Sequence, residues 1–255
     1  MNEVYLRSAQ IVGRSHILLG KNSQDALVKG SVEVNGKRVV YGVICDGCSE
    51  GKDSEVGAKL AAAFIGRRIE ILVKSGVPLY RIPSVLRTRT IGFLGNILAS
   101  VSFDSSHSYV NFIKNYLLFT IIGFVYTDEE TIVFALGDGV VVIDDEVTIR
   151  DEKNKPSYIG YHLVDRRYLS PEASVLPGKF DVVSFASSEF SRIAIASDGL
   201  AEEPLFVPEL WGYTHEIGLQ KKVNVWSDIH HKFRDDLSII TLEVVKGGDD
   251  ASLSR

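Results

Sequence analysis

One stretch decides the fold of this chain: Val39-Val40-Tyr41-Gly42-Val43-Ile44-Cys45-Asp46-Gly47, an apolar run that ends on Asp-Gly. Two further runs share the pattern, because residues 132–137 precede Asp138-Gly139 and residues 192–197 precede Asp198-Gly199. Short apolar runs that contain β-branched residues and close on a turn signal predict buried strands. The sequence therefore predicts a carboxylate at the end of each of three core strands.

A fourth feature has the reverse order, since Asp235-Asp236 comes immediately before the apolar run from Leu237 to Val245. If the ends of these strands lie together, several carboxylates share one small volume. Each close pair of like charges then costs about 4 kcal/mol at an effective dielectric constant near 20. Mg²⁺ and Mn²⁺, which prefer oxygen ligands, relieve such repulsion. The pattern thus indicates a divalent-cation site built from aspartates.

Composition excludes several classes of function. The chain has 255 residues, of which 45% are hydrophobic and 24% charged, so it can build a large core. Its formal net charge of -5 offers no general attraction for nucleic acid. The start lacks the features of a signal peptide, and the longest apolar stretch, Tyr116 to Tyr126, is shorter than the roughly 20 residues of a spanning helix. We expect a cytoplasmic protein with no nucleic-acid partner and no membrane association.

Strands and helices are predicted in separate groups along the chain. The expected strands cover residues 4–12, 25–29, 32–34, 39–45, 116–126, 131–136, 140–143, 193–196 and 237–245, and Asn35-Gly36 is a strong hairpin signal. One helix is expected to open at Ser54, and two more to cover about 84–101 and about 221–233. Residues 144–189 show no clear period. This grouping predicts a layered α+β fold, with residues 1–245 as a single domain and 246–255 as a flexible tail.

Five short motifs occur in an order that points to a known family. They are Asn22-Ser23-Gln24-Asp25-Ala26; Val43-Ile44-Cys45-Asp46-Gly47 with Ser54-Glu55-Val56-Gly57-Ala58; Leu136-Gly137-Asp138-Gly139; Ala196-Ser197-Asp198-Gly199-Leu200; and Asp235-Asp236-Leu237-Ser238-Ile239-Ile240. Each is weak alone, but together they span most of the chain. The chain resembles the metal-dependent serine/threonine phosphatases of type 2C, and Gly13-Arg14-Ser15-His16 resembles the start of a bacterial branch of that family.

The resemblance implies a four-layer α-β-β-α sandwich, in which helices flank two antiparallel sheets and a two-metal centre lies at one end. It also implies that about residues 144–189 contain the variable flap of the family, beside the active site. The matching positions make Asp46 the aspartate that bridges two divalent cations, Mn²⁺ or Mg²⁺. Gly47 would lend its backbone carbonyl to one cation, and Asp198 and Asp235 would be carboxylate ligands of the other.

The implied chemistry is the removal of phosphate from phosphoserine or phosphothreonine of a protein by a hydroxide that bridges the two cations. Asp46, Asp198 and Asp235 are the expected catalytic residues. The implied partner is a phosphoprotein substrate, and a cognate serine/threonine kinase system stays open as a second partner. Asp25 matches a carboxylate that holds metal-bound water, with Gln24 beside it, and Asp138 matches a structural aspartate of the family.

Two positions depart from the family pattern. The arginine that usually lies five residues before Asp25 and binds phosphate is replaced by Gly20, so the neighbouring Lys21 is the candidate for this role. Lysine is a point charge, whereas arginine offers a two-pronged donor. The position two after Asp46, often a histidine proposed as the acid for the leaving group, is Cys48. The alternative function is therefore a weakly active or inactive phosphatase-like module that binds a phosphoprotein or regulates a partner.

Three side chains keep two interpretations each. Cys45 and Cys48 form a Cys-x-x-Cys pattern that is compatible with a redox or zinc half-site. No paired histidines or cysteines complete a zinc site, and an interpretation without redox or zinc function is preferred. Cys48 either supplies the proton for the leaving group or only fills space, and we prefer the second. His16 either lines the site or makes a structural hydrogen bond, which is again the preferred interpretation.

Overall fold

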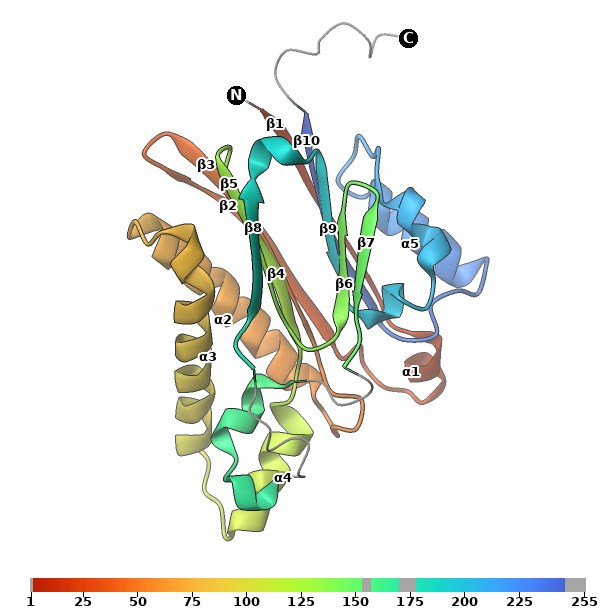
Figure 1. The fold of residues 1–255 in the computed structure, drawn as a ribbon. Coiled ribbons are helices and arrows are strands. Elements are labelled where there is room, and N and C mark those ends of the chain that lie inside the picture. The colour runs from red at the N-terminus through yellow and green to blue at the C-terminus, as the bar shows by residue number, and fades with distance from the viewer. Residues whose placement is uncertain (1, 153–156, 170–177, 246–255) are drawn as a thin grey trace, which may run out of the picture.

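The fold is a sandwich of two antiparallel sheets, seen in a computed structural model that describes residues 2–152, 157–169 and 178–245 (Figure 1). In the first sheet the strand order is β1 (Glu3–Ile11), β10 (Leu237–Val245), β9 (Arg192–Ala196), β6 (Gly139–Ile143) and β7 (Glu146–Arg150). In the second it is β2 (Asp25–Val34), β3 (Lys37–Asp46), β4 (Ile121–Tyr126), β5 (Glu130–Leu136) and β8 (Asp181–Ala186).

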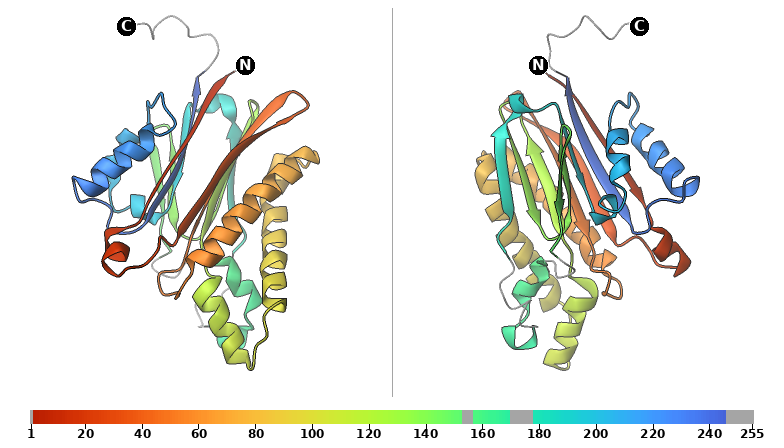
Figure 2. Two further views of the ribbon diagram at one scale, coloured as in Figure 1. Left: turned by 180° about the vertical axis from the view of Figure 1, so that it is seen from behind. Right: turned by 45° about the vertical axis from the view of Figure 1, so that its right-hand side comes forward.

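Helices cover the outer faces of both sheets (Figures 1 and 2). On the second sheet, α2 (Glu55–Lys74) packs against β2 and β3, and α3 (Ile82–Ala99) packs against α2. On the first sheet, α5 (Gly218–Asp228) packs against β1. Two shorter helices, α1 (Arg14–Leu18) and α4 (Ser106–Tyr116), lie at one end of the sandwich. The expected four-layer α-β-β-α architecture is confirmed.

Strand β4 shows why both faces of a central strand are apolar. All six of its residues are buried. Ile121 and Val125 belong to the core between the second sheet and its helices, whereas Ile122 and Phe124 belong to the core between the two sheets. Alternate residues of a strand point to opposite faces, so a continuous apolar run suits a strand that is covered on both sides.

The predicted hairpin at Asn35-Gly36 is confirmed. Both residues have positive φ values, 53° and 74°, as a type I′ two-residue turn requires. Strands β2 and β3 are continuous on either side of this turn, and their register pairs Val34 with Lys37 at one end and Asp25 with Asp46 at the other. The turn thus determines which two carboxylates face each other across the far end of the hairpin.

Three expectations about secondary structure are wrong. The strand expected over Tyr116 to Tyr126 begins only at Ile121, because Tyr116 ends α4, a helix that the apolar run concealed. Its start carries a capping box in which the side chains of Ser105 and Ser108 bond each other's backbone N–H groups. The helix expected over 221–233 ends at Asp228.

The segment expected to be irregular, residues 144–189, contains strands β7 and β8 and the short 3₁₀ turns η2 (Ile159–Leu163), η3 (Arg166–Tyr168) and η4 (Ser187–Glu189). The two strands are edge strands with mostly exposed residues, so their sequences lack the apolar runs of the core strands. Part of this segment (153–156 and 170–177) and the expected tail (246–255) lie outside the described residues. In the described parts of the chain, no helix combines the length and the apolar character needed to span a bilayer.

Candidate metal centre

Four aspartates meet at the end of the sandwich where strand ends converge. Asp25 is the first residue of β2 and Asp46 the last residue of β3, and the two are register partners. Asp198 follows β9 after one residue, and Asp235 precedes β10, the neighbour of β9 in the other sheet. The structure thus brings together Asp25, Asp46, Asp198 and Asp235.

Burial and mutual repulsion act on these carboxylates together. Burial raises the pKa of Asp46 well above its ordinary value, and the charges of Asp25, Asp198 and Asp235 raise it further. Burial likewise raises the pKa of Asp25 to about 7 and that of Asp198 to about 6. No cationic side chain appears among the causes of these three shifts. The arrangement is therefore a cluster of acids whose charges are not compensated by neighbouring side chains.

One oxygen of Asp25 points to what is missing from this cluster. Asp25 Oδ2 accepts a hydrogen bond from Ser197 Oγ at 2.7 Å, and Ser197 Oγ accepts one from the backbone N–H of Ser238 at 2.9 Å. Asp25 Oδ1 is buried without a hydrogen-bond partner. Asp25 and Asp46 affect each other's pKa by hydrogen bonding, but two ionised carboxylates offer only acceptors. An orphaned buried oxygen among further carboxylates fits a divalent cation.

Asp236 is part of the frame of the site. Its two carboxylate oxygens accept hydrogen bonds from the backbone N–H groups of Gly13, at 2.7 Å, and Gln24, at 2.6 Å. These bonds join the turn before β10 to both ends of the segment between β1 and β2. They support the expectation that Asp236 is structural while the neighbouring Asp235 faces the cluster.

His16 also belongs to this frame. Its Nδ1 atom lies 2.8 Å from Asp236 Oδ2, although at an angle that makes no hydrogen bond. His16, Asp235 and Asp236 have potential ligand atoms within 4.8 Å of one another, and this group includes neither cysteine. Because both Asp236 oxygens already accept backbone N–H groups, we interpret the group as a support for Asp235. The contact places His16 beside Asp236, and the structural hydrogen bond expected of its side chain stays a prediction.

Glycines allow the backbone segments to approach so closely. A Cβ atom on Gly13 would lie 2.2 Å from the backbone carbon of Asp235. A Cβ atom on Gly47 would lie 2.7 Å from Ser54 Oγ and 3.0 Å from the Gln24 carbonyl oxygen. Neither approach is compatible with a side chain, so both glycines are required by the site's geometry.

Gln24 and Ser54 hold the loop that carries Gly47. The Gln24 side-chain amide donates to Ser54 Oγ at 2.8 Å and to the Cys48 carbonyl oxygen at 3.3 Å. Ser54 Oγ donates to the same carbonyl at 2.9 Å, so Ser54 supports the loop and does not cap the helix that it precedes. The Gly47 backbone N–H donates to the Gln24 carbonyl oxygen at 3.1 Å. The predicted role of Gln24 near metal-bound water stays a prediction.

The two cysteines lie in the apolar core between the second sheet and its helices, and both are free thiols. Burial raises the pKa of the Cys45 thiol, and the charges of Asp46 and Asp25 raise it further. Cys48 neighbours Tyr158 of the flap. Burial raises the pKa of Tyr158, and the charge and hydrogen bonding of the Cys48 thiol and the charge of Asp46 raise it further. Sequence patterns gave no signal for the approach of Tyr158, which comes from a distant irregular segment.

The remaining predicted positions lie at the margin. Asp138 follows β5 and accepts a hydrogen bond from the Glu152 backbone N–H at 2.6 Å, and its charge contributes to the raised pKa of Asp198. Gly20 has a φ of +65° in a turn after α1, with no atom within 4 Å of an added Cβ. Lys21 is exposed in the connection to β2, so its predicted role in phosphate binding stays a prediction.

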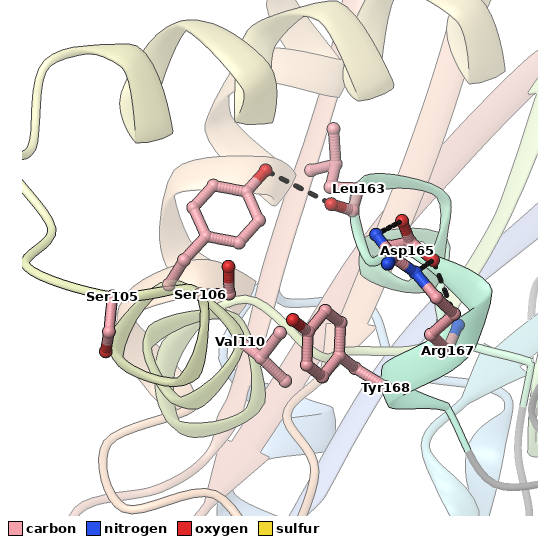
Figure 3. Close-up of a pocket in the computed structure, with 8 residues that line it drawn as sticks. Ser105, Ser106, Val110, Leu163, Asp165, Arg167 and Tyr168 are labelled. Atoms are coloured by element: carbon pink, nitrogen blue, oxygen red, sulfur yellow. Dashed lines mark hydrogen bonds and ion pairs between the residues drawn. The ribbon is translucent and has the colours of Figure 1, made fainter.

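A surface hollow of about 370 Å³ lies at the junction of α4 and the flap (Figure 3). It is lined by Ser105, Ser106, Tyr109, Val110, Leu163, Asp165, Arg167 and Tyr168. Tyr109 donates to the Leu163 carbonyl oxygen at 3.1 Å, and Arg167 pairs with Asp165 at 2.8 Å. None of the four clustered aspartates lines this hollow, and the guanidinium of Arg167 is already paired with Asp165. It is therefore separate from the candidate metal centre.

Comparisons with known proteins agree with this arrangement. A family model described as Protein phosphatase 2C matches residues 12–224. No curated protein matches the chain at a significant level.

Similar solved structures include bacterial phosphatases. A bacterial serine phosphatase shares 13% identity, with 96% of this chain and 99% of that chain covered and a TM-score of 0.56. Serine/threonine phosphatase Stp1 from Staphylococcus aureus shares 15% identity, with 97% of this chain and 96% of that chain covered and a TM-score of 0.55. The catalytic domain of serine/threonine protein phosphatase PstP, in complex with two manganese ions, shares 12% identity, with 96% of this chain and 100% of that chain covered and a TM-score of 0.58. At such low identity these structures show the shared fold, whereas the family model covers most of the chain. The chain therefore belongs to the protein phosphatase 2C family.

Proposed function

We propose that this protein is a Mn²⁺- or Mg²⁺-dependent phosphomonoesterase that removes phosphate from phosphoserine or phosphothreonine of a protein substrate. The observation that carries the proposal is the convergence of Asp25, Asp46, Asp198 and Asp235 at one end of the sandwich. Burial raises the pKa of Asp25, Asp46 and Asp198, and repulsion within the cluster raises those of Asp46 and Asp198 further. Family membership supports a phosphatase, and the cluster supports a reaction that depends on divalent cations.

The donor set fits two divalent cations. All four side chains offer oxygen, and Asp25 Oδ1 is buried without a partner. In our assignment, Asp46 would serve both cations, the Gly47 carbonyl oxygen would help to hold one, and Asp198 and Asp235 would hold the other. When bound, the cations would supply an acidic water as nucleophile and offset negative charge on the phosphoryl oxygens. The solved PstP domain contains two manganese ions, which is consistent with this stoichiometry.

The chain's own groups hold these donors in place. Ser197 fixes one oxygen of Asp25 across the two sheets, at 2.7 Å. Asp236 fixes the backbone on both sides of the segment between β1 and β2. Gln24 and Ser54 restrain the Cys48 carbonyl, which sits directly after Gly47. Because these supports are buried and hydrogen-bonded, the donors need little rearrangement when cations and substrate bind.

The second candidate function is a weakly active or inactive module that binds a phosphoprotein or regulates a partner. One specific observation favours it. Gly20 stands at the position of the family's phosphate-binding arginine, and its φ of +65° places it in a tight turn with no side chain to bind phosphate. Lys21 is then the nearest cation in sequence, and it is exposed. In an active enzyme, weaker holding of the phosphate predicts a raised KM, whereas the module predicts little or no turnover.

The experiment is phosphate release from p-nitrophenyl phosphate and from a phosphoserine peptide, with Mn²⁺ or Mg²⁺ and with EDTA. We expect release only with the cations. Asp46→Asn and Asp198→Asn should each lower kcat by at least about 10²-fold, the scale of losing one preorganised electrostatic partner. Asp128→Asn is the matched control, because this exposed aspartate lies in the hairpin at the other end of β4. Binding of the phosphopeptide without any release would favour the module.

A further inference from the structure

The short helix α1 ends in an exposed apolar tip. Ile17, Leu18 and Leu19 are consecutive, and 60%, 83% and 70% of their surfaces are accessible. Single exposed apolar residues are common on proteins, but three large consecutive ones form a continuous patch that favours contact with another molecule. Among the described residues, Leu18 is the most exposed of the large apolar side chains.

The apolar tip is tied to the candidate metal centre. At its N-terminal side, the Ser15 backbone N–H and Oγ both donate to the Arg234 carbonyl oxygen, at 3.0 Å and 2.6 Å. Arg234 directly precedes Asp235. At its C-terminal side, the Lys21 backbone N–H donates to the His16 carbonyl oxygen at 2.9 Å, and His16 is buried against Asp236. The apolar tip therefore has a determined position relative to the aspartate cluster. It lies at the same end of the sandwich as helix α4 (Figures 1 and 2).

Cations surround the apolar tip. Arg14 precedes it, Lys21 follows it, and Arg234 belongs to the turn to which it is bonded, and all three side chains are exposed. The chain as a whole carries a formal net charge of -5, so this region differs in charge from the average of the molecule. Apolar side chains among exposed cations are complementary to an acidic segment that also carries apolar residues.

We propose that the apolar tip binds the apolar residues that flank the phosphorylated residue in an acidic segment of the protein substrate. The inference rests on the proposed function, because it assigns the substrate preference of that same site. Residues beside the phosphoserine must pass the rim of the metal centre while the phosphate is bound there. The apolar tip supplies a surface for them, and Arg14, Lys21 and Arg234 supply charge that attracts acidic neighbours.

A protein segment is a better occupant than an anionic membrane surface. The apolar tip has only three apolar residues, whereas stable membrane attachment by a surface element takes a larger apolar face or a second anchoring signal. Asp235, which follows the Arg234 bonded to Ser15, would also be brought toward anionic headgroups. The membrane remains an outcome that the experiment separates.

The experiment compares two acidic phosphoserine peptides that differ only in the residues on either side of the phosphoserine, leucine in one and serine in the other. We expect kcat/KM of the wild-type protein to be at least about 10-fold higher for the leucine peptide, the usual scale for an apolar contact. Ile17→Ser/Leu18→Ser/Leu19→Ser, and the single variant Leu18→Ser to a smaller degree, should reduce this preference. Leu205→Ser is the matched control, since Leu205 is also highly exposed but lies in η6 (Pro204–Leu210), on another part of the chain.

A binding measurement separates failure of the inference from failure of the proposed function. Fluorescence anisotropy with the same two peptides, built on a non-hydrolysable phosphonate analogue of phosphoserine, reports the preference even if no phosphate is released. Tighter binding of the leucine peptide that depends on the apolar tip supports the inference. Equal affinities, or a preference that survives the triple substitution, would overturn it. Sedimentation with phosphatidylserine vesicles that is lost in the triple variant, without any peptide preference, would also overturn it.

Discussion

Substitution of Asp46 by asparagine should make the cation-free protein more stable, although it removes the central ligand of the proposed metal centre. Asp46 is buried, faces Asp25 in the β2–β3 register and is repelled by Asp25, Asp198 and Asp235. Asparagine has nearly the same shape and carries no charge. It therefore relieves both the burial of a charge and its repulsion by the neighbouring carboxylates.

The size of the effect follows from the neighbours. The pKa of Asp25 rises from 3.8 to about 7, or roughly 3 units, which corresponds to about 4 kcal/mol lost above pH 7. Burial is the largest cause of that shift and persists in the variant, and hydrogen bonding with Asp46 lowers the pKa of Asp25. The expected gain therefore comes from the charge of Asp46 itself. A single pair of like charges at contact distance costs about 1 to 4 kcal/mol between the dielectric constants of water and of about 20. We expect Asp46→Asn to raise the free energy of unfolding by about 1 to 4 kcal/mol at pH 8.

The assay is urea unfolding at pH 8 in EDTA and again in Mn²⁺. In EDTA the variant should have the higher midpoint. The difference should be smaller at pH 5, because the raised pKa of Asp46 favours its uncharged form as the pH falls. In Mn²⁺ the order should reverse, because the wild type gains the binding energy of the cations and the variant loses most of it. Asp128→Asn should change neither comparison by more than about 0.5 kcal/mol, as usual for surface substitutions. A variant less stable than the wild type at pH 8 in EDTA would refute the reasoning.

Three further predictions concern the same region. In EDTA, the wild type should lose stability as the pH rises from about 4 to about 7. The raised pKa of Asp25, about 7, makes the folded state bind more protons than the unfolded state in this range. A rise in melting temperature over this range would contradict the prediction. Gly13→Ala should destabilise the fold by about 2 kcal/mol or more and weaken Mn²⁺ binding, because its Cβ would lie 2.2 Å from the Asp235 backbone, and an unchanged urea midpoint would count against this. Cys48→Ser should leave the ratio of phosphoserine to p-nitrophenyl phosphate turnover unchanged if Cys48 only fills space, whereas a selective loss on phosphoserine would identify its thiol as the acid for the leaving group.

The parts of the fold that the sequence predicts well are those in which a local pattern coincides with burial. The run from Val39 to Asp46 is buried on both faces in β3, so its apolar character and its terminal aspartate could both be read directly. The Asn35-Gly36 hairpin needs only local turn chemistry. Both features place Asp25 opposite Asp46, which is the half of the cluster that the sequence determines locally.

Other elements escaped prediction for physical reasons. Most residues of helix α4 are polar or partly exposed, and only Val110 and Ile113 are buried, so its apolar face is too short to predict a helix. Strand β8 is an exposed edge strand and has no burial pattern to read. The contacts of Asp236 with Gly13 and of Ser197 with Asp25 join residues 223 and 172 positions apart. Such contacts arise only when the two sheets stack, so no local sequence pattern predicts them.

The most direct test of the central claim is calorimetric titration of Mn²⁺ into the EDTA-stripped, desalted wild-type protein at pH 8. If the four aspartates form the proposed centre, two Mn²⁺ ions bind per chain, and Asp46→Asn abolishes at least one of the two binding events. Absence of saturable Mn²⁺ binding, or a titration curve that Asp46→Asn leaves unchanged, would contradict the account.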